Sequence, residues 1–237
     1  MSRGESPGRS GALPTVAFAP IGEAELVERL AEFLATFPAA AQDGAAAHAG
    51  TATLRVAIDG AGATRPHELA QALIEPLRRR SRPVTHLRDD LFWRDASLRL
   101  EYGRHDLQSF AEGWLDHATL RREVLDPLGP GGSGRFLPSL RDPVSNRMTR
   151  AATIEAPPGS IVLVSGALLI RPELEFDVRI HLAMSAAALA RHTPAEAAWT
   201  LPAFASYDEE SEPSDRADVV VRLEDPRRPA IRFNASG

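Results

Sequence analysis

The segment from Leu54 to Ala70 constrains the fold more than any other part of this 237-residue chain. An apolar run, Val56-Ala-Ile58, ends at Asp59-Gly60, a glycine-containing loop follows, and a helical pattern opens at Pro66. A strand, a glycine loop and a helix in this order are the context of a phosphate-binding P-loop. The segment therefore predicts an α/β fold in which a buried strand leads through a tight loop into a covering helix.

The loop departs from the P-loop motif at the positions that carry its chemistry. Counted from Gly60, the pattern G-x-x-x-x-G-K-[ST] ends on Arg65, Pro66 and His67. The chain has no lysine, since all 27 of its basic side chains are arginines, and a planar guanidinium does not replace a lysine atom for atom. Pro66 lacks a backbone N–H, and imidazole is a poor ligand for a hard cation such as Mg²⁺. The segment thus indicates the ancestry of a phosphate site more clearly than an activity.

The rest of the chain continues the alternation of strands and helices. Short apolar runs predict strands at 54–58, 83–87, 160–165, 177–182 and 217–223. Helical patterns are found at 66–80, 117–128 and 185–192. This order predicts a three-layer α/β/α fold with a doubly wound, mainly parallel sheet.

Composition divides the chain into three parts. Residues 1–20 are expected to form a flexible N-terminus, and residues 21–50 a helix (21–37) followed by an Ala/Gly-rich linker. Residues 51–237 form the main domain, which is long enough to bury one large core.

Charge and composition exclude several classes of protein. A formal net charge of −5 argues against a general binder of nucleic acid or of an anionic membrane surface. The absence of cysteine excludes disulfides, a thiolate nucleophile and a zinc–thiolate site. No apolar run approaches the ~20 residues that span a bilayer, and Met1 to Arg9 do not follow the plan of a signal peptide. We expect a cytoplasmic protein without a nucleic-acid or membrane partner.

Polar or small residues follow four of the predicted strands. They are Asp59-Gly60, Arg88-Asp89-Asp90, Ser165-Gly166 and the residues after Leu182. The carboxyl ends of parallel strands meet at one edge of a sheet, where ligands bind in such folds. We therefore expect one cleft there, with the Asp89-Asp90 pair at its edge; solvated or capping acids are the alternative.

Together these landmarks resemble the uridine kinase branch of the P-loop nucleoside kinases, especially divergent proteins of that kind from high-GC bacteria. The resemblance covers the chain from Leu54 to its C-terminus. It rests on the segments 56–60, 89–90, 120–132, 161–170, 171–174 and 216–221.

The resemblance implies a P-loop NTPase-like fold and the phosphorylation of a nucleoside or a similar small alcohol by ATP or GTP with Mg²⁺. Asp89 then matches the aspartate that accepts the proton of the attacking hydroxyl, with Asp90 beside it. Phosphate contacts fall on Gly60, Gly62 and Arg65 in the loop and on Arg191 in the lid, and substrate contacts on Arg141 and Arg147 in the middle loop.

The same resemblance shows what this chain has replaced. The acidic residue that the family carries at the end of the 161–164 strand is Ser165 here, and no residue is assigned to a metal. With the lysine and the metal-binding hydroxyl also missing, we expect phosphoryl transfer to be weak or lost.

Two further interpretations stay open. One is a non-catalytic protein on the same fold that binds a small ligand, such as a nucleoside, or a protein partner. The other concerns Trp93, Phe110 and Trp114, which either stack on a base or pack in the core. A dinucleotide fingerprint is disfavoured, because Gly60-x-Gly62 lacks its third glycine, at whose place Arg65 stands.

Overall fold

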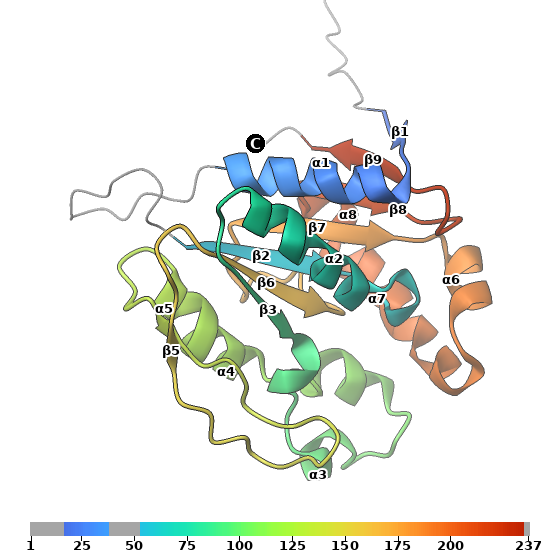
Figure 1. Cartoon of the computed structure of the whole chain (residues 1–237). Helices are drawn as coiled ribbons and strands as arrows, with labels where there is room; N and C mark the ends of the chain where they lie inside the picture. The colour runs from blue at the N-terminus through green and yellow to red at the C-terminus, as the bar shows by residue number, and fades with distance from the viewer. Residues whose placement is uncertain (1–16, 38–52, 235–237) are drawn as a thin grey trace, which may run out of the picture.

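The computed structural model describes residues 17–37 and 53–234. Its main feature is a seven-stranded sheet flanked by helices (Figure 1). In spatial order the strands are β1 (Ala19–Pro20), β9 (Ala230–Phe233), β8 (Val219–Arg222), β7 (Val178–Ala183), β2 (Leu54–Asp59), β6 (Ile161–Gly166) and β3 (Val84–Arg88). The five strands from β8 to β3 run parallel to one another, which confirms the predicted α/β fold with a mainly parallel sheet.

Helices cover both faces of this sheet. The longer ones are α1 (Glu23–Thr36), α2 (Pro66–Arg79), α6 (Ala186–His192) and α7 (Leu201–Ser211). The shorter ones are α3 (Ala96–Arg99), α4 (His117–Leu120), α5 (Asp126–Leu128) and α8 (Pro213–Arg216). The helix predicted over 117–128 consists of α4, a wider turn over 121–125, and α5. The short strands β4 (Arg135–Phe136) and β5 (Ile154–Glu155) pair with each other.

The sheet is buried because alternate residues of each central strand face different helices. Every residue of β2 and β6 is buried. Val56 and Ile58 belong to the same core as α1 and α2, whereas Ala57 packs with α4 and α5 on the other face. The register pairs Leu54 with Ile161 and therefore brings Asp59 level with Gly166 at the carboxyl edge.

The structure adds elements that periodicity did not predict. β1 and β9 are too short to show alternation, and they extend the sheet by antiparallel pairing on one side. α7 shows a weak apolar pattern, because only Ala203 and Tyr207 of its residues are buried. The flexible N-terminus predicted over 1–20 and the linker before residue 51 lie largely outside the described residues; Ala19 and Pro20 form β1.

Helix α1 packs in the same core as the central strands, although the predicted linker separates it from them in sequence. Its Leu26, Leu30 and Leu34 are buried against α2 and the sheet. We predict that Leu30→Ala lowers the free energy of unfolding by about 2–5 kcal/mol, because it leaves a cavity in this core. Urea denaturation measures the effect. The exposed Glu32 on the same helix is the control, and Glu32→Ala should change stability by less than about 0.5 kcal/mol. Equal effects of the two substitutions would mean that α1 is not part of the core.

Candidate functional site

The loop that joins β2 to α2 has the course of a phosphate loop but a different interior. The amide of Gly60 donates to Gly166 O at 2.9 Å, which ties the start of the loop to the end of β6. Gly62 to Thr64 form a single 3₁₀ turn. Arg65 then takes the left-handed conformation, φ 58° and ψ 53°, at the position where the motif has its second glycine.

The side chain of Thr64 fills the space inside this loop. Its Oγ1 donates to Ala61 O at 2.8 Å, and a Cβ atom on Gly60 would lie only 2.3 Å from it. The amides of Thr64 and Arg65 donate to Ala61 O and Gly62 O. These donors are therefore bonded within the loop, whereas a phosphate-binding nest directs its N–H groups at the anion.

Arg65 points away from the loop that it was predicted to complete. Its side chain is 64% exposed, and its guanidinium lies 3.4 Å from the carboxylate of Glu68, one turn into α2. An exposed pair of this kind contributes little energy, so the side chain is free to move. Arg65 does not line either of the cavities described below.

The two aspartates lie at the edge predicted for them. Asp89 follows β3, and its carboxyl group packs on Gly166, where an added Cβ would lie 2.2 Å from Asp89 Cγ. The amide of Ala167 donates to Asp89 Oδ2 at 3.2 Å. Asp59, Asp89 and Ser165 are thus neighbours at the carboxyl ends of adjacent strands, as the topology predicts.

Burial sets the electrostatics of this pair. It raises the pKa of Asp89 to about 7, and the nearby Asp90 raises it further, while the backbone amide of Ala167 acts in the opposite direction. Asp90 pairs with Arg88 through Oδ2. Its Oδ1 is buried and has no hydrogen-bond partner within the described ranges. A carboxyl group that titrates near neutrality suits acid–base work.

A buried serine joins two histidines behind Asp89. Ser165 Oγ lies 2.7 Å from His67 Nδ1 and 2.7 Å from His86 Nε2. His67 Nε2 in turn faces Asp89 Oδ1 at 3.6 Å, which is too long for a direct hydrogen bond. His67 and Ser165 replace the hydroxyl residue and the acid of the resembled family. In the structure these two residues are within hydrogen-bond distance, and His86 contacts the same serine.

The chemistry of a hydroxyl group couples the two rings. Ser165 has one proton to donate, so it donates to one histidine and accepts from the other. Burial lowers the pKa of His86 to about 4 and also lowers the pKa of His67, so both rings are neutral at pH 7. A P-loop kinase has charged groups around Mg²⁺ at this place. In this protein the same place is occupied by the hydrogen-bonded side chains of His67, Ser165 and His86, which are uncharged at pH 7.

Two cavities flank the loop, and the first is rich in aromatic rings. We call it the aromatic cavity; its volume is about 340 Å³. Its polar lining residues include His67, Arg88, Asp89 and Asp90, beside the loop glycines Gly60 and Gly62. Its other lining residues include Trp93, Phe110, Trp114, His117 and Phe204. Phe110 and Trp114 meet edge to face at 5.2 Å between ring centroids.

The second cavity, of about 440 Å³, lies between the end of β7 and helices α7 and α8, and we call it the acidic cavity. It shares Gly60, Leu168 and Phe204 with the aromatic cavity, so the two adjoin at the loop. The single cleft expected from the sequence is therefore divided. The carboxylates that line the acidic cavity are those of Asp59, Asp208, Glu209, Glu212 and Asp215.

The floor of the acidic cavity is a buried network that the sequence did not reveal. Asp59 accepts hydrogen bonds from His181 Nδ1 at 2.8 Å and from the hydroxyl of Tyr207 at 3.2 Å. The amide of Leu169 donates to its other oxygen at 2.8 Å. Burial, and then the nearby Asp59, raise the pKa of Tyr207. This network fixes α7 to the end of β2 across 148 residues of sequence.

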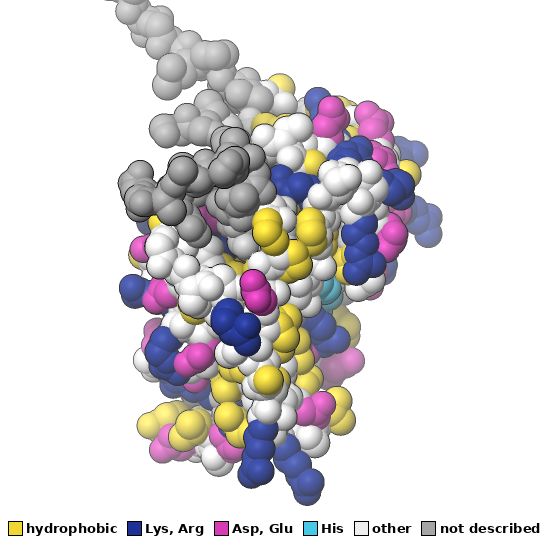
Figure 2. Space-filling view, turned by 60° about the vertical axis from the view of Figure 1, so that its left-hand side comes forward, with side chains coloured by type: hydrophobic (Ala, Val, Ile, Leu, Met, Phe, Trp, Pro, Cys, Tyr) yellow, Lys and Arg dark blue, Asp and Glu magenta, His cyan; other side chains and the backbone are white. Residues whose placement is uncertain are grey.

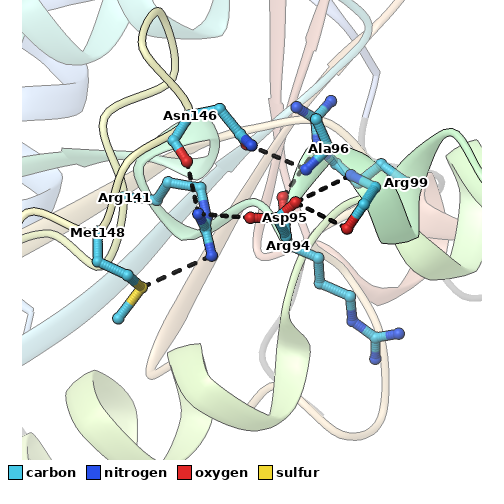
Figure 3. A network of polar contacts seen from close by, with 8 residues as sticks. Arg94, Asp95, Ala96, Arg99, Arg141, Asn146 and Met148 are labelled. Carbon is cyan, nitrogen blue, oxygen red and sulfur yellow. Dashed lines mark hydrogen bonds and ion pairs between the residues drawn. The ribbon is translucent and has the colours of Figure 1, made fainter.

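The predicted substrate and lid arginines lie elsewhere. Arg141 Nη1 pairs with Asp95 at 3.0 Å and donates to Asn146 O, which holds the middle loop against the start of α3 (Figure 3). Arg147 and Arg191 are exposed. None of the three lines either cavity, so their predicted contacts with substrate or phosphate stay predictions.

One face of the molecule is mixed in charge. Acidic and basic side chains alternate over the face seen in Figure 2, where no single-sign patch dominates. None of the helices within the described residues is long and apolar enough to cross a membrane. The same residues contain no group of three or more histidine, aspartate or glutamate side chains placed to hold a metal ion.

Comparison with known proteins supports the fold. No protein-family model matches the chain, and a search of curated proteins also finds no match. Among solved structures, a possible uridine kinase from Bacillus stearothermophilus superposes with a TM-score of 0.61 at 18% identity, covering 82% of this chain and 96% of that one.

Two more distant structures are also similar. A candidate fructose transport system kinase from Silicibacter sp. TM1040 gives a TM-score of 0.47 at 17% identity, over 80% of this chain and 91% of that one. The YGR205w protein gives 0.49 at 10% identity, over 78% and 91%. At these identities the likeness concerns the fold alone, and it rests on the first structure. The chain therefore has a fold similar to that of the possible uridine kinase, as the resemblance of its sequence implied.

Asp89 makes stability depend on pH. Its folded pKa of about 7 lies above its ordinary value of 3.8, so the folded state binds the proton more tightly and stability falls as pH rises through that window. Asn resembles the protonated carboxyl group and does not titrate. We predict that Asp89→Asn raises the free energy of unfolding at pH 8 by more than at pH 5, with a difference on the order of a few kcal/mol. Urea denaturation at both pH values tests this, and an equal effect at both would show that Asp89 ionises normally.

Proposed function

We propose that this chain is a uridine kinase-like protein that binds a nucleoside or similar small alcohol in the aromatic cavity and has little or no ATP-dependent phosphotransferase activity. Its role is then that of a ligand-binding, pseudokinase-like protein. The cytoplasmic location expected from the sequence is part of this proposal.

The interior of the loop is the observation that carries the proposal. The side chain of Thr64 packs against Gly60 and bonds to Ala61 O inside the loop, and two loop amides are bonded within the loop. Pro66 supplies no N–H, and Arg65 extends toward solvent. Five carboxylates line the cavity beside the loop, and they would repel a triphosphate. Each of these features weakens ATP binding, and they act in the same direction.

The aromatic cavity supplies what a nucleoside needs. Rings of Trp93, Phe110 and Trp114 offer faces and edges for a base. Asp89 and His67 Nε2, 3.6 Å apart, are spaced so that one ligand hydroxyl can bond to both. A pocket of this kind, largely apolar with a few polar groups on one side, is the usual form of a small-molecule site.

Weak phosphoryl transfer is the second candidate, and one observation favours it. Asp89 lies beside the loop and titrates near pH 7, as a base for an alcohol would. In that case Asp89 accepts the hydroxyl proton, while Arg65 and Arg191 swing in to contact the phosphates of Mg-ATP or Mg-GTP. Nucleotide binding separates the two candidates.

We predict that Mg-ATP binds no more tightly than about the millimolar range. The chain lacks the lysine and the metal-holding hydroxyl, and each charge-assisted contact contributes ~1.5–3 kcal/mol, so the loss of two corresponds to at least about a hundredfold in affinity. Isothermal titration calorimetry with and without Mg²⁺ should give the same weak signal, and Arg65→Ala should leave it unchanged. Micromolar binding that needs Mg²⁺ and is abolished by Arg65→Ala would instead establish the kinase candidate.

Nucleoside binding has its own test. We predict that uridine changes the fluorescence of the cavity tryptophans, and that Phe110→Leu weakens its affinity at least about fivefold, since a stacked ring contributes ~1–3 kcal/mol. Leucine keeps most of the volume but not the ring. Tyr102, an exposed aromatic residue outside the cavity, provides the control Tyr102→Leu. Uridine binding that is insensitive to Phe110→Leu, or absent altogether, would reject the aromatic cavity as a nucleoside site.

A further inference from the structure

His67 reaches the aromatic cavity from the start of helix α2, and a buried hydroxyl group holds the other side of its ring. Its Nε2 lies 3.6 Å from Oδ1 of Asp89, which lines the same cavity. Its Nδ1 lies 2.7 Å from Oγ of Ser165. Ser165 is fully buried and lines neither of the two cavities, so its hydroxyl group can act on a ligand only through His67.

Three elements of the fold fix the place of this hydroxyl group. Ser165 follows Ile161 and Leu163 at every second position of β6, so it lies on the face of the sheet that packs against α2. On the neighbouring strand β3, His86 is paired with Leu163 and lies on the same face. Its Nε2 lies 2.7 Å from Ser165 Oγ. An apolar residue at position 165 would leave Nδ1 of His67 without this partner.

Asp89 determines the direction of these hydrogen bonds when it is ionised, which is the case above its pKa of about 7. A carboxylate only accepts, so the ring nitrogen that faces it, Nε2 of His67, carries the proton. Burial lowers the pKa of His67 and the ring is neutral, so Nδ1 then accepts from Ser165. Ser165 Oγ in turn accepts from Nε2 of His86. Every donor in this chain of hydrogen bonds therefore points toward Asp89.

We propose that Ser165, with His86 behind it, is a positioning residue of the aromatic cavity, and that it turns His67 so that Nε2–H donates to the ligand hydroxyl that donates to Asp89. The proposal rests on the proposed binding of a nucleoside or similar alcohol in this cavity. It also defines the ligand group that fits between His67 and Asp89, because this group must accept and donate at once. A hydroxyl group does both, whereas an ammonium group only donates and an ether oxygen only accepts.

Nitrogen-15 NMR of the histidine rings tests the positioning in the full chain without a ligand. At pH 8 we expect both His67 and His86 in the Nε2–H tautomer. In Ser165→Ala the resonance of His67 Nδ1 should move to that of a ring nitrogen without a hydrogen bond. The exposed His192 on α6 is the internal control, and its resonances should stay unchanged. An Nδ1–H tautomer of His67 in the unaltered chain, or an unchanged Nδ1 resonance in Ser165→Ala, would overturn the proposal.

Uridine affinity shows whether Ser165 acts through His67. We expect Ser165→Ala and His67→Phe each to weaken uridine binding at least about threefold, as the loss of one hydrogen bond does. In the His67→Phe background, Ser165→Ala should have no further effect, because a positioning residue has nothing left to position. Ser165→Thr keeps the hydroxyl group and should restore the affinity. Ser160→Ala is the matched control, since Ser160 is also buried but lies at the opposite end of β6.

The remaining outcomes separate a positioning role from a structural one. Weakening by Ser165→Ala that is the same with and without His67 would mean that the serine only supports the local packing, and this result would reject the proposal. Equal weakening by Ser160→Ala would do the same. Circular dichroism checks that each variant folds. If uridine does not bind the unaltered chain, the proposed function fails, and the NMR comparison still decides whether Ser165 holds His67.

Discussion

The close approach of β2, β6 and β3 at their carboxyl ends is the constraint on which the site depends. Gly60 and Gly166 lie at this edge, and the amide of Gly60 donates to Gly166 O at 2.9 Å. Neither position has room for a Cβ, since Thr64 packs on the first and Asp89 on the second. The absence of side chains at these two glycines therefore allows the loop, Asp89 and Ser165 to lie close together.

This edge separates two environments of different chemistry. On the β3 side, Ser165 joins two neutral histidines next to a carboxyl group that titrates near neutrality, and aromatic rings close the cavity. On the β7 side, four carboxylates line the same cavity as the His181–Asp59 pair, those of Asp208, Glu209, Glu212 and Asp215. A P-loop protein that holds a triphosphate needs positive potential and free N–H groups across this region. In this protein the same region contains two neutral histidines hydrogen-bonded to Ser165 and a cavity lined by carboxylates. For this reason we propose a ligand other than Mg-ATP.

Much of the fold could be predicted from the sequence because burial on both faces gives the central strands unbroken apolar runs. The expected strands at 54–58, 83–87, 160–165, 177–182 and 217–223 agree with β2, β3, β6, β7 and β8 to within about two residues. β9 and α7 were missed for a physical reason. β9 has only four residues, and only two residues of α7 are buried, so neither shows a clear periodicity in the sequence.

The sequence by itself determined that the fold is α/β with a mainly parallel sheet, that the loop lacks the lysine and the final Ser/Thr of the P-loop motif, and that Asp89 stands at the sheet edge, because each follows from local pattern and spacing. Only the tertiary structure decided what replaces the lost groups. The contacts of Ser165 with His67 and His86 span 98 and 79 residues, and that of Tyr207 with Asp59 spans 148. Hydrogen bonds between side chains so far apart depend on strand register and helix docking, and neither can be read from one sequence.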